Sequence, residues 1–360
     1  MEAIRQHPRL DLQVAVTGMH LLKSVGNSWR QIVSDGWRID ARIPVQNDQD
    51  DATGQSRCLG RAIVKMTDAF AKLKAELVLV LGDRLEAFAA AATATASQIP
   101  IGHIHGGDVA VGVQDEAYRH AITKLAHVHF VATSGARRRL IRLGEEIHRV
   151  HQTGSPGLDG LDQAICNDTR QLTKWACQNV EEPFFLVLQH PSGASAGVEE
   201  QYMTQTLAAC AARKLPLVII MPNIDPGFSG IVRACKAFAR RPGVGLVGNL
   251  PRGGFLGLLS RCTALIGNSS SGLIEAEYFG TPVVNIGPRQ MGRERGKYVI
   301  DVNYGKNSVI QGLRAAQNGR RNRRGRTKFT YGDGRSGARI ADIIAKTEFG
   351  NSLLQKKIAY

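Results

Sequence analysis

Short apolar runs alternate with longer amphipathic segments along most of the chain. The apolar runs have the length of β-strands, and the segments between them repeat apolar residues at the spacing of an α-helix. Strands are predicted at Leu12–Val16, Leu77–Leu81, Ile101–Ile104, Val128–Ala132, near Val150, and at Phe184–Leu188, Pro216–Ile220, Gly245–Val247, Ala264–Ile266 and Pro282–Ile286. Helices are predicted at Arg84–Ser97, Asp115–Leu125, Gly135–Leu143, Tyr202–Arg213 and Gly272–Phe279. This alternation predicts an α/β fold of parallel sheets with right-handed crossovers.

The predicted strands form two series, separated by the polar segment at residues 167–183. A chain of 360 residues also exceeds the usual size of a single core. We therefore predict two Rossmann-like domains, at residues 1–166 and 167–334. Ligands of such sheets bind beyond the carboxyl ends of the strands. Functional residues are thus expected after strand ends, facing a cleft between the domains.

The first domain begins in an unusual way. A helical segment, MEAIRQH, leads directly into the strand-like LDLQVAV. A Rossmann-like domain normally starts with a strand and a tight turn before its first helix. We expect either that this domain lacks its first strand or that the true start lies upstream of Met1.

Charge and composition narrow the class of protein. The formal net charge is +15, and the densest basic cluster is GRRNRRGRTK at Gly319–Lys328. No nucleic-acid-binding motif accompanies this cluster, so a solvated loop or a general attraction of anionic substrates is favoured over a nucleic-acid partner. The chain has no apolar run of membrane-spanning length, and its first residues, MEAIRQHPRL, lack the basic-then-apolar layout of a signal peptide. The six cysteines are scattered and include no Cys-x-x-Cys pair, which indicates reduced thiols. Together these features predict a cytoplasmic protein.

Three groups of residues in the first domain could carry chemistry. Asp83 and Arg84 follow a buried strand; Asp83 either caps the next helix or, with Arg84, faces a ligand. In HIHGGD, strand alternation places His103 and His105 on one face, as in a two-histidine metal pair with Asp108 as third ligand. A metal is disfavoured because no second ligand pair is evident. Gly106-Gly107 lacks the spacing of a dinucleotide or phosphate loop.

The segment DEAYRHAI adds a further pair to that domain. Asp115 and Arg119 are four residues apart and share one helix face. They form either an ordinary surface ion pair or a charge pair that holds an acid or base in place next to the glycine-rich turn.

The second domain contains candidate anion-binding residues. His190 ends a strand, where it either binds or protonates an anionic leaving group or serves as a capping histidine. Asn223 and Asp225 follow the next strand. The Ser-rich turn before the helix at Ser270–Gly272 suits a diphosphate through free amides and hydroxyls, and Glu275 is placed to accept hydrogen bonds from ribose hydroxyls.

Taken in order, these motifs resemble one enzyme family over nearly the whole chain. They are VTGMHLLKSVGN, LGDRLEAFAAA, HIHGGD, DEAYRHAITKLAHVHFVAT, GSPGLD, HP, PNIDPG, IGNSSSGLIEAEYFGTPVVNIGPRQMGRERG and YGDG. The chain is similar to the hydrolysing UDP-N-acetylglucosamine 2-epimerases of sialic-acid and related nonulosonic-acid biosynthesis. The resemblance implies the two-domain fold of B-type nucleotide-sugar glycosyltransferases, with a last helix at residues 335–360 packed on the first domain. It also implies a homodimer or homotetramer.

The resemblance further implies a reaction without metal or nicotinamide cofactor. A base removes the proton at sugar C2 while UDP leaves C1, and water adds to the resulting glycal to release the free 2-epimer. By position, Asp83 and Asp115 match acid/base residues, His190 matches a residue that stabilises or protonates the diphosphate, and Arg119 matches a partner of Asp115. The positions that match UDP-sugar-binding residues are Arg84, Arg119, His190, Asn223, Ser269, Ser270, Glu275 and Arg289.

The chain departs from the family pattern in two places. Many members have a glutamate, a proposed acid or base, where this chain has His105. We interpret this as a subgroup variant in which His105 is an acid/base candidate beside Asp108. Family members also have a strand and a TGTRADY-like turn upstream of the position at which this chain begins. The resemblance therefore predicts either a mis-assigned start codon or a truncated protein of weak or no activity.

Two other functions stay open on the sequence. One is a UDP-sugar glycosyltransferase of the same fold, and the other is a non-catalytic UDP-sugar-binding protein. The sequence also leaves open whether the sugar is N-acetylglucosamine or a 2,4-diacetamido-trideoxy sugar.

Overall fold

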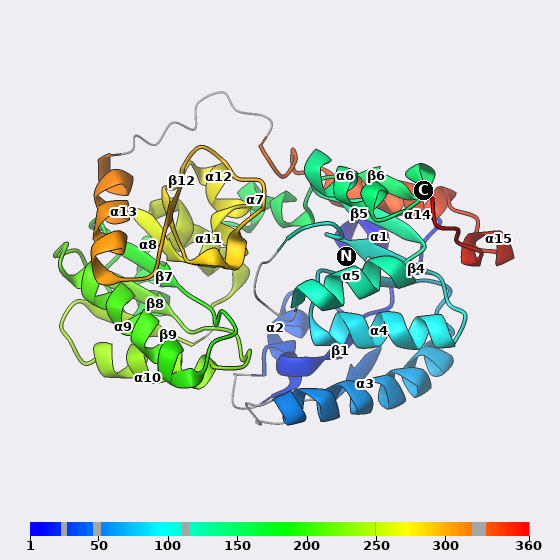
Figure 1. Cartoon of the computed structure of the whole chain (residues 1–360), viewed down its shortest axis with the longest axis horizontal. Coiled ribbons are helices and arrows are strands. Elements are labelled where there is room, and N and C mark those ends of the chain that lie inside the picture. The colour runs from blue at the N-terminus through cyan, green and yellow to red at the C-terminus, as the bar shows by residue number, and fades with distance from the viewer. Residues whose placement is uncertain (23–26, 46–51, 110–114, 249, 319–328, 360) are drawn as a thin grey trace. The chain divides into compact units, whose positions relative to one another are not determined.

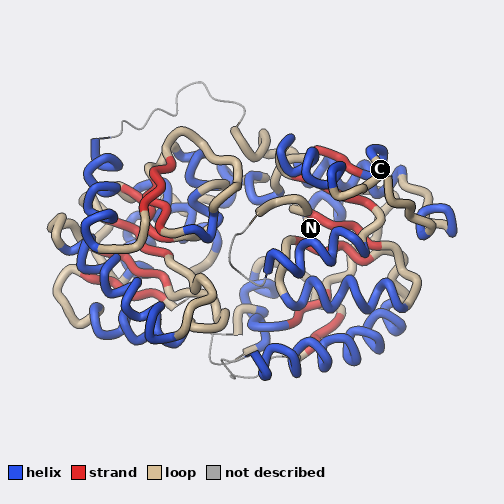
Figure 2. Tube along the Cα trace, in the orientation of Figure 1, coloured by secondary structure: helices blue, strands red, loops and turns tan. Residues whose placement is uncertain are grey.

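The computed structural model describes residues 1–22, 27–45, 52–109, 115–248, 250–318 and 329–359. The chain divides into two compact units (Figure 1). The first unit contains Met1–Val109, Gln114–Asp159 and Tyr331–Tyr360, and the second contains Gly160–Thr330. In each unit the strands lie in the middle and the helices lie outside them (Figure 2).

All strand pairs of the first unit are parallel. A four-stranded sheet has the order β3-β4-β5-β6, and β1 pairs separately with β2. The strands are β1 (Ala15–Thr17), β2 (Ala41–Ile43), β3 (Val78–Leu81), β4 (Ile101–Ile104), β5 (Val128–Val131) and β6 (Val150–Gln152). The helices are α1 (Glu2–Gln6), η1 (Gly18–Leu21), α2 (Trp29–Ser34), α3 (Ala52–Leu73), α4 (Leu85–Ala96), α5 (Asp115–Leu125), α6 (Ser134–Arg142), η3 (Ile147–Arg149), η4 (Pro156–Leu158), α14 (Ser336–Lys346) and α15 (Asn351–Leu354).

Helices cover both faces of the four-stranded sheet. Helices α3, α4 and α5 lie side by side (Figure 1) and bury one face, which includes Val78 and Val80. Four alanines of α4 are buried there, because small side chains let the helix approach the sheet closely. Ile340 and Ile344 of α14 pack against Phe130 on the other face. A parallel sheet covered on both faces explains why its strands read as unbroken apolar runs.

The second unit contains one parallel sheet with the strand order β12-β11-β10-β7-β8-β9. Its strands are β7 (Phe185–Leu188), β8 (Leu217–Ile220), β9 (Val244–Val247), β10 (Ala264–Gly267), β11 (Val283–Ile286) and β12 (Val299–Val302). Its helices are α7 (Leu161–Ala164), α8 (Thr169–Ala176), α9 (Ala196–Ala211), α10 (Phe228–Phe238), α11 (Arg252–Arg261), η5 (Ser270–Gly272), α12 (Glu275–Phe279), η6 (Pro288–Gln290) and α13 (Lys306–Asn318). Helices α9, α10 and α13 pack on the face that contains Phe185, Val187 and Ile266.

Each strand predicted from the sequence overlaps an observed strand, whereas β2 and β12 were not predicted. β2 has only three residues, too few to show alternation. β12 lies at the edge of its sheet, carries Asp301 and is only partly buried, so its sequence lacks a continuous apolar run.

Three sequence features have simple structural outcomes. None of the helices in the described part of the chain combines the length and apolarity needed to span a membrane. All six cysteines are free thiols. The basic cluster Gly319–Lys328 lies outside the described residues.

A buried carboxylate connects the C-terminal segment to the body of the first unit. Glu145 is fully buried and accepts hydrogen bonds from Lys124 Nζ at 2.9 Å and His129 Nε2 at 3.0 Å. Lys356 Nζ, from the segment after α15, lies 2.7 Å from Glu145 Oε2. Burial by itself raises the pKa of Glu145, but the hydrogen bonds from His129, Lys356 and Lys124 outweigh it and lower the pKa to about 2.

We expect this cluster to make the first unit sensitive to acid. Because the pKa of Glu145 is lower in the folded chain than its usual 4.5, its contribution to stability is complete above about pH 4.5 and is lost as the pH falls towards 2. Glu145→Gln should lower the free energy of unfolding at pH 7 by about 3–5 kcal/mol, because half-buried Lys356 then lacks its counter-charge. Urea unfolding across this pH range measures both effects. An unchanged midpoint in the variant would contradict the account.

Candidate active site

The predicted residues of the first unit gather at the carboxyl ends of two neighbouring strands. Asp83 and Arg84 follow β3, and the segment from His105 to Asp108 follows β4. The two strands pair in parallel, with Val80 opposite His103, so their ends meet at one edge of the sheet. Helix α5 starts at Asp115, which is half-buried, and brings Arg119 to the same edge.

A buried arginine joins these elements. Arg119 is 0% exposed and forms ion pairs with Asp83 and Glu116. Its Nη1 also donates a hydrogen bond of 3.0 Å to the carbonyl of Asp108. A planar guanidinium has donors on three sides, so one side chain can hold groups from β3, α5 and the loop after β4 together.

This arrangement changes two expectations. Arg119 is not part of a surface pair, because its side chain is fully buried. Asp83 does not cap α4: the N-cap residue is Arg84, without a side-chain cap, and the Asp83 carboxylate pairs with Arg119 instead. Leaving a buried guanidinium without a carboxylate partner costs about 3–5 kcal/mol, which is more than the roughly 1 kcal/mol that one capping hydrogen bond contributes. Arg84 Nε lies 4.0 Å from the Glu86 carboxylate.

The two histidines of HIHGGD do not share a strand face. β4 ends at Ile104, and His105 has a φ of +65°, in the left-handed region. The alternation of side chains therefore stops before His105. His103 Nε2 bonds to the carbonyl of Gly82 at 2.8 Å, and burial lowers the pKa of His103 to about 3. His103 is a neutral core histidine.

His105 has two partners of its own. Its Nδ1 lies 2.9 Å from Asp108 Oδ2, and its Nε2 lies 2.9 Å from Ser155 Oγ. All three residues are buried. Asp108, considered above as a third ligand of the disfavoured metal site, is thus a hydrogen-bond partner of His105. Among the residues that the structure describes, no group of three or more His, Cys, Asp or Glu side chains is arranged to hold a metal ion.

In the second unit, His190 follows β7 and is fixed by two asparagines. The backbone N–H of His190 donates to Asn268 Oδ1 at 2.7 Å, and Asn268 Nδ2 donates to the carbonyl of His190 at 2.9 Å. The backbone N–H of Asn223, after β8, donates to His190 Nδ1 at 3.2 Å. Because Nδ1 accepts this bond, the neutral ring carries its hydrogen on Nε2 and presents a donor on that side.

The Ser-rich turn differs from the prediction. The predicted helix at Gly272–Phe279 is a three-residue 3₁₀ turn, η5, followed by the five-residue helix α12 that starts at Glu275. The amides of Ser271, Gly272 and Leu273 donate within the turn, to Ser269 Oγ and to the carbonyls of Ser269 and Ser270. The amides of these three residues are therefore not free, in contrast to the prediction.

The other predicted residues of this unit lie at the same sheet edge. Arg289 is in η6 after β11, and its Nη1 lies 3.3 Å from the carbonyl of Asn268. Asp225 lies before α10, where its carbonyl accepts from Phe228 N at 3.0 Å. Strands β11, β10, β7 and β8 are consecutive neighbours in the sheet, so the segments that carry Arg289, Ser269, His190 and Asn223 follow adjacent strand ends.

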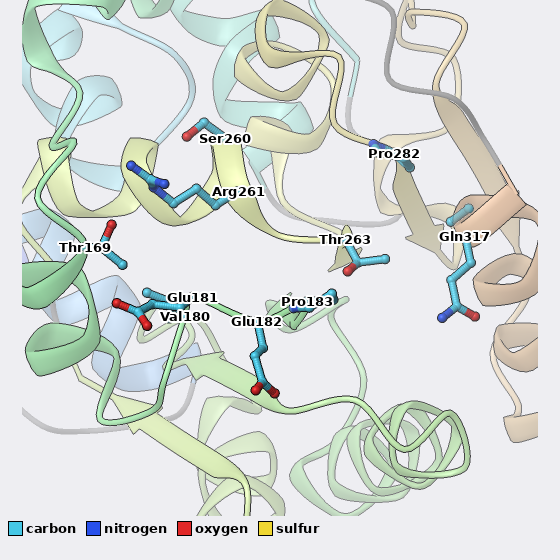
Figure 3. A pocket seen from close by; sticks show the side chains of 11 residues that line it. Thr169, Val180, Glu181, Glu182, Pro183, Ser260, Arg261, Thr263, Pro282 and Gln317 are labelled. Atoms are coloured by element: carbon cyan, nitrogen blue, oxygen red, sulfur yellow. The ribbon is translucent and has the colours of Figure 1, made fainter.

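One surface pocket of about 650 Å³ lies elsewhere on the second unit (Figure 3). Among the residues that line it, Thr263 and Pro282 come directly before β10 and β11, and Pro183 lies two residues before β7. These are the amino ends of the strands, opposite to the ends that carry His190 and Ser269. None of the residues predicted to bind a UDP-sugar lines this pocket.

The sequence did not single out three residues that organise the two clusters. Glu116 shares Arg119 with Asp83, Ser155 bonds to His105, and Asn268 bonds to His190. Ser155 and Asn268 each follow a strand end, which is the signal that could have identified them. Their partners come from other strands, so the contacts themselves are visible only in the folded chain.

Comparison with known proteins identifies an enzyme family. The sequence profile of the family UDP-N-acetylglucosamine 2-epimerase matches residues 2–345. The chain is 33% identical over 362 residues to the UDP-N,N'-diacetylbacillosamine 2-epimerase (hydrolyzing) of Legionella pneumophila, covering 100% of this chain and 94% of that protein. It is 32% identical over 317 residues to the polysialic acid biosynthesis protein P7 of Escherichia coli, covering 87% of this chain and 81% of that protein.

Solved structures show the same fold. The crystal structure of UDP-GlcNAc 2-epimerase from Neisseria meningitidis bound to UDP-GlcNAc superposes with a TM-score of 0.77 at 18% identity, covering 96% of this chain and 94% of that chain. The predicted fold class, two α/β domains with parallel sheets like those of B-type glycosyltransferases, is confirmed.

We expect the buried cation to dominate the stability of the first cluster. Arg119→Met should lower the free energy of unfolding by about 3–5 kcal/mol, because the carboxylates of Asp83 and Glu116 lose their shared counter-charge. Urea unfolding measures the change. Arg138→Met is the matched control, because Arg138 is exposed on α6 and surface substitutions usually change stability by less than about 0.5 kcal/mol. Equal effects of the two substitutions would refute the role given to Arg119.

Proposed function

The chain belongs to the UDP-N-acetylglucosamine 2-epimerase family, and we propose that it is a hydrolysing member acting on a UDP-linked 2-acetamido sugar. The observation that carries the hydrolysing assignment is the match to the Legionella pneumophila protein, which spans all of this chain and whose name contains the word hydrolyzing. The substrate of the proposal is UDP-N-acetylglucosamine or a UDP-2,4-diacetamido sugar such as UDP-N,N'-diacetylbacillosamine.

The proposed reaction has two balanced steps. A base takes the proton from C2, the C2–H electron pair forms a C1–C2 double bond, and the C1–O bond breaks to release UDP. Water then adds its hydroxyl to C1, and an acid delivers a proton to C2 from the opposite face. The products are UDP and the free 2-epimer. Because the C2 proton is weakly acidic, the reaction needs both placed carboxylates and a stabilised leaving group.

The first unit supplies the acid/base residues of the proposal. Asp83 lies at a strand end, and the ion pair with buried Arg119 orients its carboxylate. Asp115 begins α5, on the helix that carries Arg119. Both are acid/base candidates at C2, with His105 a third candidate. The Asp83 carboxylate, held by a buried cation, meets the requirement of fixed geometry for proton transfer.

The second unit supplies the UDP-binding residues of the proposal. His190 carries its hydrogen on Nε2, which suits donation to a diphosphate oxygen, and Arg289 adds a positive charge. The hydroxyls of Ser269 and Ser270 are further donors, Asn223 orients His190, and Glu275 is an acceptor for ribose hydroxyls. Arg84, in the first unit, is the remaining cation proposed to bind the substrate.

Turnover in D₂O tests the reaction type. The chain is incubated separately with UDP-N-acetylglucosamine and UDP-N,N'-diacetylbacillosamine, and products are followed by NMR and mass spectrometry. We expect UDP together with a free 2-epimer that carries deuterium at C2, because the proton is replaced from solvent. Asp83→Asn should reduce this exchange by at least about 100-fold, the usual contribution of one acid/base group.

Other products would point to other functions. Release of a UDP-linked 2-epimer would indicate a non-hydrolysing epimerase, and sugar transfer that requires an acceptor would indicate a glycosyltransferase. Tight UDP binding without turnover of either sugar would indicate a binding protein. Each of these outcomes would overturn the proposal.

The role of His190 predicts a specific pair of variants. In His190→Asn, the amide oxygen can replace Nδ1 as acceptor for Asn223 N–H, but the Nε2 donor is lost. UDP affinity should fall about 10- to 100-fold, as expected for a hydrogen bond to a charged group. Calorimetric titration with UDP measures this loss. His148→Asn, on an exposed side chain, is the control, and equal UDP affinity in the two variants would rule out the role.

A further inference from the structure

Three buried side chains of the first unit form a continuous hydrogen-bonded series. Asp108 Oδ2 lies 2.9 Å from His105 Nδ1, and His105 Nε2 lies 2.9 Å from Ser155 Oγ. Asp108 is 3% exposed, His105 9% and Ser155 1%. The order carboxylate, imidazole, hydroxyl is that of the Ser-His-Asp series of hydrolases. Ser155 is too buried to attack a substrate. The hydrogen bonds therefore act on the imidazole, which they orient, and do not activate the hydroxyl.

The contacts determine where the hydrogens lie. An ionised carboxylate only accepts, so Asp108 requires a hydrogen on His105 Nδ1. Ser155 Oγ already accepts from the backbone N–H of Gly157 at 3.1 Å. Its own hydrogen then points to His105 Nε2, which accepts it. A doubly protonated imidazole would instead leave the Ser155 hydrogen without an acceptor among the residues described here, at the energetic cost of a buried unsatisfied group.

The backbone holds both ends of the series in place. His105 adopts its left-handed conformation while its N–H donates to the carbonyl of Phe130 at 3.0 Å. The N–H of Ser155 donates to the carbonyl of Tyr331 at 2.7 Å. A non-glycine residue in this conformation is strained, and such strain persists only where surrounding contacts maintain it. The bonds to Asp108 and Ser155 are such contacts.

We propose that Ser155 is a positioning residue for His105: Asp108 holds the imidazole hydrogen on Nδ1, and the Ser155 hydroxyl fixes the ring with the Nε2 lone pair as acceptor. This inference rests on the proposed function, in which His105 is an acid/base candidate. The Nε2 lone pair is the basic site of the ring, and it can take a proton only when the Ser155 side chain turns away from it. Ser155 thus prepares His105 as a base without itself contacting the substrate.

The tautomer can be measured without any substrate. In protein labelled with [¹⁵N]histidine, long-range ¹H–¹⁵N spectra distinguish a protonated nitrogen from an unprotonated one, and His105→Gln identifies the signals of His105 among the ten histidines. We expect a protonated Nδ1 and an unprotonated, hydrogen-bonded Nε2. In Ser155→Ala the Nε2 signal should move towards that of a nitrogen without a partner, and in Asp108→Asn the hydrogen should move to Nε2. A wild-type His105 with hydrogen on Nε2, or on both nitrogens, overturns the inference.

Kinetics separate positioning from a purely structural role. Ser155→Ala should lower kcat about five- to ten-fold with little change in KM, the size expected for one lost hydrogen bond. Ser155→Thr retains the hydroxyl and should restore both kcat and the Nε2 signal. If the spectra show the expected tautomer but neither UDP-sugar is turned over, the proposed function fails and the assignment of Ser155 stands. Unchanged kcat and an unchanged Nε2 signal in Ser155→Ala remove the positioning role.

Discussion

The guanidinium of Arg119 is the interaction on which the arrangement of the first unit's candidate residues depends. It is fully buried and holds the Asp83 carboxylate from the end of β3, the Glu116 carboxylate from α5 and the Asp108 carbonyl from the loop after β4. Removing such a charge from water costs several kcal/mol, which only close, well-directed partners recover. Because the partners must be close and well directed to offset this desolvation cost, the cluster is stable in only one geometry. A carboxylate held in this way has a fixed position, and proton transfer requires a base in a fixed position.

The second unit reaches similar order by neutral hydrogen bonds. The side-chain amide of Asn268 bonds to both the N–H and the carbonyl of His190, so the ends of β7 and β10 are joined across the sheet. This approach needs Gly267, whose φ is +138° and where a Cβ would lie 2.0 Å from the Leu188 carbonyl oxygen. The imidazole of His190 is then oriented by Asn223. In both units, the parallel sheet places polar loops side by side at its carboxyl edge. The loops of the first unit are ordered by ion pairs, and those of the second unit by hydrogen bonds of an amide side chain.

His105 shows how the orientation of an imidazole depends on the residues around it. A glutamate there would carry its own charge and would need no tautomer. An imidazole has two nitrogens, and its tautomer depends on which of them carries the hydrogen. In this chain, Asp108 at Nδ1 and Ser155 at Nε2 fix the tautomer from opposite sides of the ring. Asp108 is three residues away in sequence, whereas Ser155 comes from the loop after β6, with β5 lying between β4 and β6 in the sheet.

The sequence alone determined the class of fold and the edges at which chemistry would be found, because apolar periodicity and strand-end positions are local properties. It thereby placed Asp83, Asp115 and His190 correctly after strands or at a helix start. It did not reveal that Arg119 is buried, that His105 leaves the strand at a positive φ, or that the amides of Ser271, Gly272 and Leu273 are bonded within their own turn. Only the tertiary structure decided these points. A partner such as Ser155 is separated from His105 by 50 residues, and nothing local to either residue specifies that contact.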